Sequence, residues 1–509
     1  MSISVFEIIG PIMVGPSSSH TAGMARLGLM AHHIIGFSPE FIELILHPAL
    51  RYTYQGHRTD AALIGGLMGI TADDIELRGA LNWAKLRGIH HQVSFCQDTL
   101  CNPNTVTINV SGQGQAVSVR GVSVGGGSIC IDQIDHFSVA LTGASYILLL
   151  WGNADVGAHL DRAGLSAEAS AYGDEQLYII SSEKPFDDDL MELLHSMQDV
   201  RQIRLIPPAL PYGTREGAEP LFTCYAQLLE LAESSSIPTV AIAYEANRSG
   251  KEPSEIRAYM AKVLGVMKEA DQRGQTEPLA LTYGLASGKD GKLLAAAAQN
   301  GTTLSGYTLS MSIARALGIM EVNGSMGCVV ASPTAGSCGI IPGCLLTLQE
   351  ERGLTDDDLI DALFTAAIVG VVMHFQQISF SGVVGGCQGE IGVSSAMAAA
   401  ALTYLGGGDA EAILHSVALS LKNLLGLICD PIAGPIEVPC IKRNSVGVAN
   451  AFAAADMALA GIRSFIPPDE VLDALRNVQE LLPRELKGTT VGGLACTQTA
   501  IRVREHLRN

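Results

Sequence analysis

The spacing of small apolar residues in the second half of the chain is the feature that most constrains the fold. Alanine, leucine and valine recur every three or four residues over 357–373, 410–425 and 448–462, which is the period of a buried α-helix. Only 5% of the residues are aromatic, while glycine occurs 55 times, and this favours closely packed helices over a β-sandwich. We therefore predict an all-α domain over residues 222–509, with its chemistry in the loops rich in Gly, Pro and Cys.

The first part of the chain has a different pattern. Residues 41–46 form an apolar run of strand length, and residues 105–110 alternate as a half-buried strand does. Residues 21–35 and 60–67 are helical in character. This mixture predicts an N-terminal α+β domain over residues 1–145.

Short strands and helices alternate in the segment that follows. Strands are predicted at 146–150, 176–182 and 201–206, and helices at 158–172 and 187–197. The pattern fits a small ferredoxin-like module over 146–206, without an obvious fourth strand. Residues 207–221 contain four prolines and two glycines, which predicts an interdomain linker.

Charge and hydropathy limit the partners. The formal net charge is −19, which argues against nucleic acid and against anionic membranes. Three long stretches with little or no charge, 322–349, 361–374 and 391–408, are interrupted by polar residues, Gly or Pro, or are too short to span a bilayer. The first residues carry no basic segment or cleavage site typical of a signal peptide. We expect a cytoplasmic protein that acts on small molecules.

Eleven cysteines are present, and disulfides are improbable in such a protein. Cys387, Cys429 and Cys440 stand out because glycine or proline lies close to each. Their separations of 42 and 11 residues match no zinc finger or ferredoxin pattern. Three thiolates can hold three corners of a cubane and leave one iron open as a Lewis acid. By spacing alone, buried structural cysteines explain the pattern better.

Two segments place histidine at the start of a predicted helix. His20 follows a run of three serines, where hydroxyls and backbone N–H groups make an anion site. His57 lies in Gly-His-Arg-Thr-Asp, residues 56–60. Either imidazole can act as a base near neutral pH. The alternative is a helix cap with an incidental histidine.

Two Gly/Ser-rich turns, 323–327 and 332–339, can present backbone amides to an anion, or their glycines serve helix packing. Together the motifs indicate an enzyme with an anion site, two candidate bases and three loop cysteines.

These motifs, taken together, resemble the iron–sulfur-dependent L-serine dehydratases. The part similar to their β chains comprises GPSSSHTAGMARLG (15–28), GHRTDAALIGGLMG (56–69) and SVGGGSI (123–129). The part similar to their α chains comprises LASGKDGKL (285–293), EVNGSMGCVVASPTAGSCGIIPG (321–343), GGCQGEIG (385–392), CDPIAGPIEVPCIKRN (429–444) and VGGLA (491–495). These motifs resemble those of the two-subunit enzymes, and the parts similar to the two subunits are joined here in one polypeptide.

The resemblance implies a multidomain fold. The first domain would be like an allosteric substrate-binding domain, and the middle module like a shortened, degenerate ACT domain. The helical domain would be catalytic and would hold a [4Fe–4S] cluster on Cys387, Cys429 and Cys440, without pyridoxal phosphate. A homodimer is expected from the same likeness.

The resemblance also implies roles in converting L-serine to pyruvate and ammonia. The open iron would polarise the substrate hydroxyl, and His57, or else His20, would remove the Cα proton. Further contacts to the amino-acid substrate would come from Ser17, Ser18, Ser19, Thr21, Asn323, Ser325, Ser332 and Thr334.

Four alternatives stay open. Cysteine desulfidation and threonine deamination would use the same scaffold. A non-catalytic amino-acid sensor would bind its ligand through the middle module. An electron-transfer protein would need a cluster with a protein ligand on every iron, and the presence of only three candidate cysteines argues against this. Cys496 lies thirteen residues before the end, and whether it approaches the cluster is open.

Overall fold

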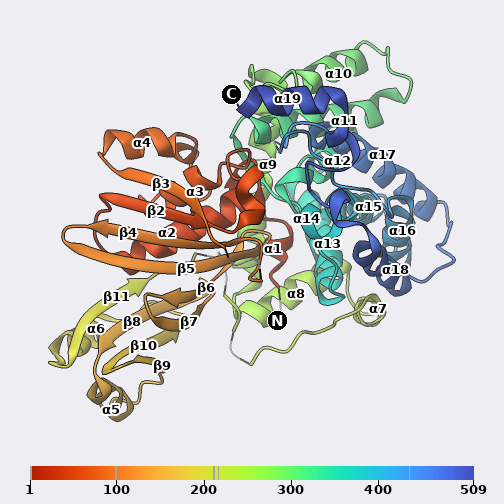
Figure 1. Ribbon diagram of the computed structural model, residues 1–509. Helices are drawn as coiled ribbons and strands as arrows, with labels where there is room; N and C mark the ends of the chain where they lie inside the picture. The colour runs from red at the N-terminus through yellow and green to blue at the C-terminus, as the bar shows by residue number, and fades with distance from the viewer. Residues whose placement is uncertain (1–2, 98–99, 210–212, 216, 435, 509) are drawn as a thin grey trace. The chain divides into compact units, whose positions relative to one another are not determined.

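The computed structural model describes residues 3–97, 100–209, 213–215, 217–434 and 436–508 (Figure 1). The chain forms two compact units. One consists of Ser19–Arg215, and the other joins Met1–Ser18 to Glu216–Asn509. An N-terminal α/β region and a C-terminal helical region are therefore present, as the sequence predicts. The predicted boundaries at 145, 206 and 221 stay predictions, but the first eighteen residues pack with the helical unit rather than with the α/β unit.

The larger sheet of the α/β unit has six strands in the order β3-β2-β4-β5-β6-β7. Their bounds are β2 (Phe41–Leu46), β3 (His90–Phe95), β4 (Thr105–Gly112), β5 (Gln115–Gly125), β6 (Ser128–Ile134) and β7 (Phe137–Leu141). β2 and β3 run parallel, and the other neighbours are antiparallel. Alternate residues of β4 are buried, which is the pattern of a sheet with one face on the core. The strands predicted at 41–46 and 105–110 are confirmed.

Two glycines let the main helices of this unit touch through their backbones. α2 (Gly23–Ile35) packs on α3 (Thr59–Leu67). A Cβ at Gly28 would lie 2.3 Å from the carbonyl oxygen of Leu63, and one at Gly66 would lie 2.2 Å from that of Ala25. No larger side chain fits at either place. The contact brings the turns before the two helices together, and these turns carry His20 and His57. The remaining short helices are η1 (Ser18–Ala22), η2 (Pro48–Tyr52), η3 (Ile75–Gly79) and α4 (Ala80–Leu86).

The smaller sheet has four antiparallel strands in the order β11-β8-β10-β9. The elements are β8 (Tyr146–Gly152), α5 (Ala154–Arg162), β9 (Glu168–Tyr172), β10 (Glu175–Ser182), α6 (Asp188–Ser196) and β11 (Val200–Ile206). The order βαββαβ is that of a ferredoxin-like fold. The prediction of a helix over 158–172 without a fourth strand is wrong, because α5 ends at Arg162 and β9 supplies the strand. β9 is a largely exposed edge strand, so no apolar alternation marks it in the sequence.

Arg204 of β11 attaches this module to the first part of the unit. Its Nε donates to the carbonyl oxygen of Ile34 (3.2 Å), and its Nη2 donates to that of Ile35 (3.1 Å). These are the last carbonyls of α2, where helix ends leave acceptors unpaired. A cation at that end is also favoured by the helix dipole.

The other unit is predominantly helical. Its first helices are α1 (Val5–Ile8), α7 (Tyr225–Ala232), α8 (Ile237–Ser249), α9 (Pro253–Thr276), α10 (Asp290–Gln299), α11 (Gly306–Gly324) and α12 (Ile340–Arg352). The later ones are α13 (Asp356–Phe375), α14 (Gly382–Gly385), α15 (Val393–Leu405), α16 (Ala410–Asn423), α17 (Cys440–Leu459), α18 (Pro468–Leu481) and α19 (Gln498–Arg508). Single turns are η4 (Ala335–Ser337), η5 (Gln388–Gly392), η6 (Arg484–Leu486) and η7 (Gly493–Cys496). The helices predicted at 357–373, 410–425 and 448–462 are confirmed.

Helix α15 forms the centre of this core. Every residue over 393–403 is buried, and α15 packs against α12, α13, α16 and α17. α13 has the length and composition of a membrane span, but 78% of its apolar window is buried inside the protein. It therefore reads as a core helix, as the sequence predicts.

The N-terminal segment is built into this helical core. β1 (Ile12–Val14) pairs antiparallel with β12 (Cys328–Val330). The Ser4 hydroxyl and the Val5 N–H both donate to the carboxylate of Glu245, at 3.0 Å. Arg248 lies 2.6 Å from the same carboxylate, and both charged side chains are buried.

The predicted linker is only partly described. Residues 210–212 and 216 lie outside the described residues. The other residues between β11 and α7 contain no helix or strand.

Candidate functional site

The three predicted ligand cysteines converge in the helical unit. Cys387 directly precedes η5, Cys429 lies in the segment after α16, and Cys440 begins α17. The Sγ atoms of Cys387 and Cys429 lie within 4.8 Å of each other and of a carboxylate oxygen of Glu390. Cys440 is not part of this group, but the charge of Cys387 acts on its thiol, so it lies in the same region and its role as a third ligand stays a prediction. The first two cysteines are buried and Cys440 is half-buried.

Hydrogen bonds to loop backbones hold two of these cysteines in place. The side chain of Gln388 donates to the carbonyl oxygen of Gly385 (2.9 Å) and accepts from the N–H of Gly426 (2.9 Å). It thereby ties the Cys387 loop to the segment that leads to Cys429. The backbone of Cys429 pairs with the C-terminal segment: its N–H donates to Leu486, and its carbonyl accepts from Gly488.

Arg443 places a positive charge beside the thiols. Its Nη1 lies 3.5 Å from Cys387 Sγ, and its Nη2 donates to Oδ1 of Asp430 at 2.6 Å. Asp430 is 2% exposed, and its other oxygen accepts from the N–H of Leu494. The charge of Arg443 opposes the rise in the pKa of the Cys440 thiol. The VGGLA segment therefore supports the site through Asp430.

The acidic groups of the site oppose one another's ionisation. Burial raises the pKa of Glu390 to about 7, against the influence of Thr334 and Arg443. A hydrogen bond with Cys387, burial and nearby negative charge raise the pKa of Cys429 well above its usual range. Burial, with the charges of Cys387 and Glu390, does the same for Cys440. A bound metal would displace the protons and relieve this repulsion.

The donor set fits an iron–sulfur cluster. Thiolates are the ligands that such clusters take, and Arg443 offsets the charge of three of them. Gly382 leaves room beside the sulfur, because a Cβ there would lie 2.9 Å from Cys429 Sγ and 2.6 Å from Glu390 Oε2. The residues that would hold the cluster are Cys387, Cys429 and Cys440.

The two predicted bases meet in the α/β unit. The rings of His20 and His57 stack with centroids 4.6 Å apart and an interplanar angle of 5°. Each is held by the threonine of the other's motif. The Thr21 hydroxyl donates to the carbonyl oxygen of His57 (2.7 Å), and the Thr59 hydroxyl donates to that of His20 (3.0 Å).

Hydrogen bonds define the proton positions on His20. Nδ2 of Asn104 donates to the carbonyl oxygen of Ser123, so its Oδ1 faces Nε2 of His20 at 3.1 Å as an acceptor. Nε2 therefore carries the hydrogen, and Nδ1 carries the lone pair. Nδ1 of His57 is buried and has no hydrogen-bond partner in the part of the chain that the structure describes.

Both imidazoles are held neutral. Burial lowers the pKa of His20 to about 4, although the hydrogen bond with Asn104 opposes this. Burial, followed by the charge of His20, lowers the pKa of His57 well below its usual range. Neutral imidazole is the form that accepts a proton.

Four of the predicted substrate contacts surround the turn before α12. Asn323 donates from Nδ2 to the carbonyl oxygens of Pro16 (3.3 Å) and Ala335 (3.0 Å), so it joins the serine-rich turn to η4. Ser325 donates to its own helix end. Thr334 lies beside Ser337 and acts on Glu390, and Ser332 is buried in the same turn. Their roles as substrate contacts stay predictions.

The serine-rich motif is divided between the two units. Ser17 and Ser18 belong to the helical unit, whereas Ser19 and Thr21 belong to the α/β unit. The Thr21 hydroxyl donates to His57, as described above. Substrate binding by these four residues also stays a prediction.

Sequence reasoning missed Gln388, Glu390, Asp430 and Arg443. All four lie within the cysteine motifs, but no spacing rule singles them out. The available signal is that charged or amide side chains occur in an otherwise apolar region, where a buried polar group needs a partner. Cys496 is exposed and does not belong to the candidate metal-binding group found among the described residues.

Buried thiols that converge beside a cation in a helical core are typical of metalloproteins with thiolate ligands. The sequence comparison makes the assignment specific. The chain matches the serine dehydratase alpha chain model over residues 232–495 and the serine dehydratase beta chain model over residues 4–99. It therefore belongs to the serine dehydratase family, with alpha and beta parts in one polypeptide.

Individual relatives agree with this assignment. A probable L-serine dehydratase alpha chain of Bacillus subtilis is 42% identical over 281 residues, which is 55% of this chain and 93% of that protein. The probable beta chain of the same organism is 33% identical over 40% of this chain and 97% of its own length. An L-serine dehydratase of Streptomyces coelicolor is 27% identical over 97% of this chain and 99% of its own length.

Proposed function

We propose that this protein is an L-serine dehydratase that converts L-serine to pyruvate and ammonia with a [4Fe–4S] cluster on Cys387, Cys429 and Cys440. The observation that carries the proposal is the grouping of the Cys387 and Cys429 thiols with Glu390 beside Arg443, in a region where the charge of Cys387 also acts on Cys440. The names of relatives that align along almost the whole chain agree with it. Besides a Lewis acid, the reaction requires a base, and the paired neutral histidines supply it.

When bound, the cluster supplies a Lewis-acidic iron that weakens the bond between the substrate's Cβ and its hydroxyl oxygen. The remaining steps belong to the chain. His57 takes the proton from Cα, the C–O bond breaks, and a C=C bond forms as hydroxide leaves and is protonated to water. The resulting aminoacrylate tautomerises and is hydrolysed to pyruvate and ammonia. His20 and the hydroxyls of the serine-rich motif bind the carboxylate.

The chain's own residues prepare this site in two ways. Arg443 places a positive charge 3.5 Å from Cys387 Sγ and, through its ion pair with Asp430, fixes the loop that carries Cys429. Burial, followed by the charge of the stacked His20, keeps His57 neutral so that it can accept a proton. No pyridoxal phosphate is needed, because the metal is the electrophile.

The decisive experiment is an anaerobic assay of the iron-reconstituted protein. Pyruvate and ammonia are followed with L-serine, L-cysteine and L-threonine in parallel, before and after exposure to air. We expect turnover of L-serine that air abolishes. Cys429→Ser should lose both iron and activity, whereas Cys496→Ser, which changes an exposed thiol, should keep both.

Other results would redirect the assignment. Preferred turnover of cysteine or threonine would keep the mechanism and change the substrate. An intact cluster without turnover of any of the three would support a sensor or an electron carrier. Activity in a metal-free, aerobic preparation would refute the proposal.

We also propose a cytoplasmic location and a homodimer. None of the described cysteines forms a disulfide, which suits a reducing compartment. Light scattering of the purified protein measures the oligomeric state directly.

A further inference from the structure

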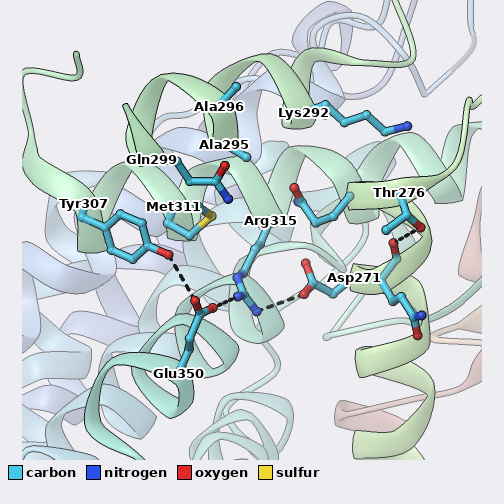
Figure 2. Close-up of a pocket in the computed structure, with 12 residues that line it drawn as sticks. Asp271, Thr276, Lys292, Ala295, Ala296, Gln299, Tyr307, Met311, Arg315 and Glu350 are labelled. Carbon is cyan, nitrogen blue, oxygen red and sulfur yellow. Dashed lines mark hydrogen bonds and ion pairs between the residues drawn. The ribbon is translucent and has the colours of Figure 1, made fainter. Parts of the chain in front are cut away.

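A second polar pocket, with a volume of about 400 Å³, lies in the helical unit (Figure 2). Its walls come from α9, α10, α11 and α12, and none of the three clustered cysteines lines it. Its size is that of a site for a small molecule. The proposed reaction uses none of its side chains.

Polar and charged side chains of α9, α11 and α12 are linked to one another around the pocket. The Tyr307 hydroxyl donates to Oε1 of Glu350 (3.2 Å), and Arg315 bridges Glu350 and Asp271. The distance from Arg315 Nη1 to Asp271 Oδ2 is 3.0 Å. Figure 2 shows the guanidinium between the two carboxylates.

This chain leaves two buried atoms without partners. Oδ1 of Asp271 accepts no hydrogen bond and Nε of Arg315 finds no acceptor within the described part of the chain. Asp271 is only 9% exposed. Burial raises its pKa and nearby Glu350 adds to this, although Arg315 and a hydrogen bond of the carboxylate with Gln275 oppose both. A buried carboxylate oxygen without a donor is a site for a cationic group.

The balance of charges in the pocket limits the net charge of a ligand. Two carboxylates, Asp271 and Glu350, are matched by two cations, Arg315 and Lys292. The two carboxylates would repel a strong anion, and the two cations would repel a dication. Lys292 lies on α10, a different wall from Asp271 on α9. The remaining lining is amide, hydroxyl and small apolar side chains: Gln272, Gln275, Thr276, Ala295, Ala296, Gln299 and Met311.

We propose that this pocket binds a small zwitterion, a free amino acid, with its ammonium on Asp271 and its carboxylate on Lys292. The ammonium supplies the donor that Asp271 Oδ1 lacks. The site is distinct from the cysteine cluster and does not depend on the proposed reaction.

The pocket communicates with the cysteine region through α10. The N–H groups of Asp290 and Gly291, at the start of α10, point to the carboxylate of Glu321. Asp290 pairs with Lys442 at 3.3 Å, and Lys442 follows Cys440 by two residues. Lys292 of the pocket therefore lies on a helix whose first residue is paired with the first turn of the helix that carries Cys440.

Calorimetric titration of the full chain tests the proposal, and it requires neither cluster nor activity. The probes are glycine, L-alanine and L-glutamine, compared with acetate and methylammonium, each of which lacks one of the two charged groups. We expect at least one amino acid to bind, and both fragments to bind at least about tenfold more weakly, because each loses one ion pair.

Three variants locate the binding. Asp271→Asn and Lys292→Ala should each weaken the amino acid about tenfold or more. Glu351→Gln should not, because Glu351 is the neighbour of Glu350 but does not line the pocket and accepts from Thr308 instead. Equal thermal midpoints show that the variants are folded.

Three results would overturn the proposal. One is no binding of any amino acid at concentrations of about 10 mM. Another is affinity unchanged in both pocket variants, which would place the binding elsewhere, for example at the substrate site. The third is acetate or methylammonium binding as tightly as the amino acids. A protein that fails as a lyase but shows this binding pattern would refute only the proposed function.

Discussion

Burial and close neighbours set the chemistry of single residues here. His20 and His57 are kept neutral because the surrounding protein disfavours their charged forms. The Cys429 thiol holds its proton because of a hydrogen bond with Cys387, burial and nearby negative charge, and the Cys440 thiol does so because of burial and nearby negative charge. The first effect suits a base, and the second suits a site that a metal must complete.

Replacing His57 by alanine tests its role as the base. Loss of a positioned base lowers turnover by about 10²- to 10⁴-fold, so we expect that loss with the visible cluster spectrum unchanged. His90→Ala, on the exposed start of β3, should be neutral. If His57→Ala retains activity, His20 becomes the candidate base.

The depressed pKa of His20 predicts a pH-dependent stability. Below pH 6.5 the unfolded chain binds a proton at His20, while the folded chain does not until about pH 4. Unfolding free energy should therefore fall as pH drops through this window, by up to about 1.4 kcal/mol per pH unit. Both tryptophans, Trp83 and Trp151, lie in the α/β unit, so fluorescence reports its unfolding. His20→Gln should reduce the slope, and an equal slope in the variant would contradict the assignment.

Gly382 tests the space beside the thiols. Its replacement by alanine places a Cβ 2.9 Å from Cys429 Sγ and 2.6 Å from Glu390, which forces a shift in the site. We expect lower iron and sulfide content after reconstitution. Gly265→Ala in α9 has open space around the new Cβ and should load normally. Full iron content in Gly382→Ala would show that the site tolerates the extra carbon.

Secondary-structure elements that are far apart in the sequence stabilise each other. The cap of α1 and the side chains of α8 share one buried ion pair, because Ser4 and Val5 donate to Glu245 while Arg248 balances its charge. β1 extends the contact by pairing with β12.

Glu245→Gln should therefore be strongly destabilising. It removes the carboxylate that lies 2.6 Å from the buried Arg248 guanidinium, and breaking a buried ion pair by removing one partner costs about 3–5 kcal/mol. Denaturant unfolding followed by helical circular dichroism measures the loss. Glu411→Gln, which breaks an exposed pair with Arg463, should cost no more than about 1 kcal/mol. Similar effects of the two substitutions would argue against a stabilising role of the buried Glu245–Arg248 pair.

At the scale of the whole molecule, the chain order and the compact units do not coincide. Residues 4–18 match the beta-type family model and yet pack with the alpha-type helices. Each unit has its own core, with β-sheets in one and the buried helix α15 in the other.

Dividing the chain should reveal this difference. We expect residues 19–215 to fold alone with a cooperative transition. Residues 216–509 should be markedly more stable with residues 1–18 joined through a flexible linker than without them, because β12 otherwise loses its paired strand and Glu245 loses the hydrogen bonds from Ser4 and Val5. Thermal unfolding of the three proteins makes the comparison. Equal stability with and without residues 1–18 would refute the conclusion that this segment stabilises the helical unit.

The sequence by itself determined the helices over 357–373, 410–425 and 448–462 and the strand at 41–46, because periodicity records which local face is buried. It also singled out the loop cysteines and both histidine motifs, whose residues resemble those of a known family. These are properties of short windows of sequence.

Only the tertiary structure decided which distant groups meet. The edge strand β9 carries no apolar alternation, so its place in the sheet depends on pairing with β10. The stacking of His20 on His57 depends on helices that touch at Gly28 and Gly66. Arg443 acquires its role only where loops 56 residues apart bring it to Cys387. Such contacts depend on chain folding over long separations, and no local period records them.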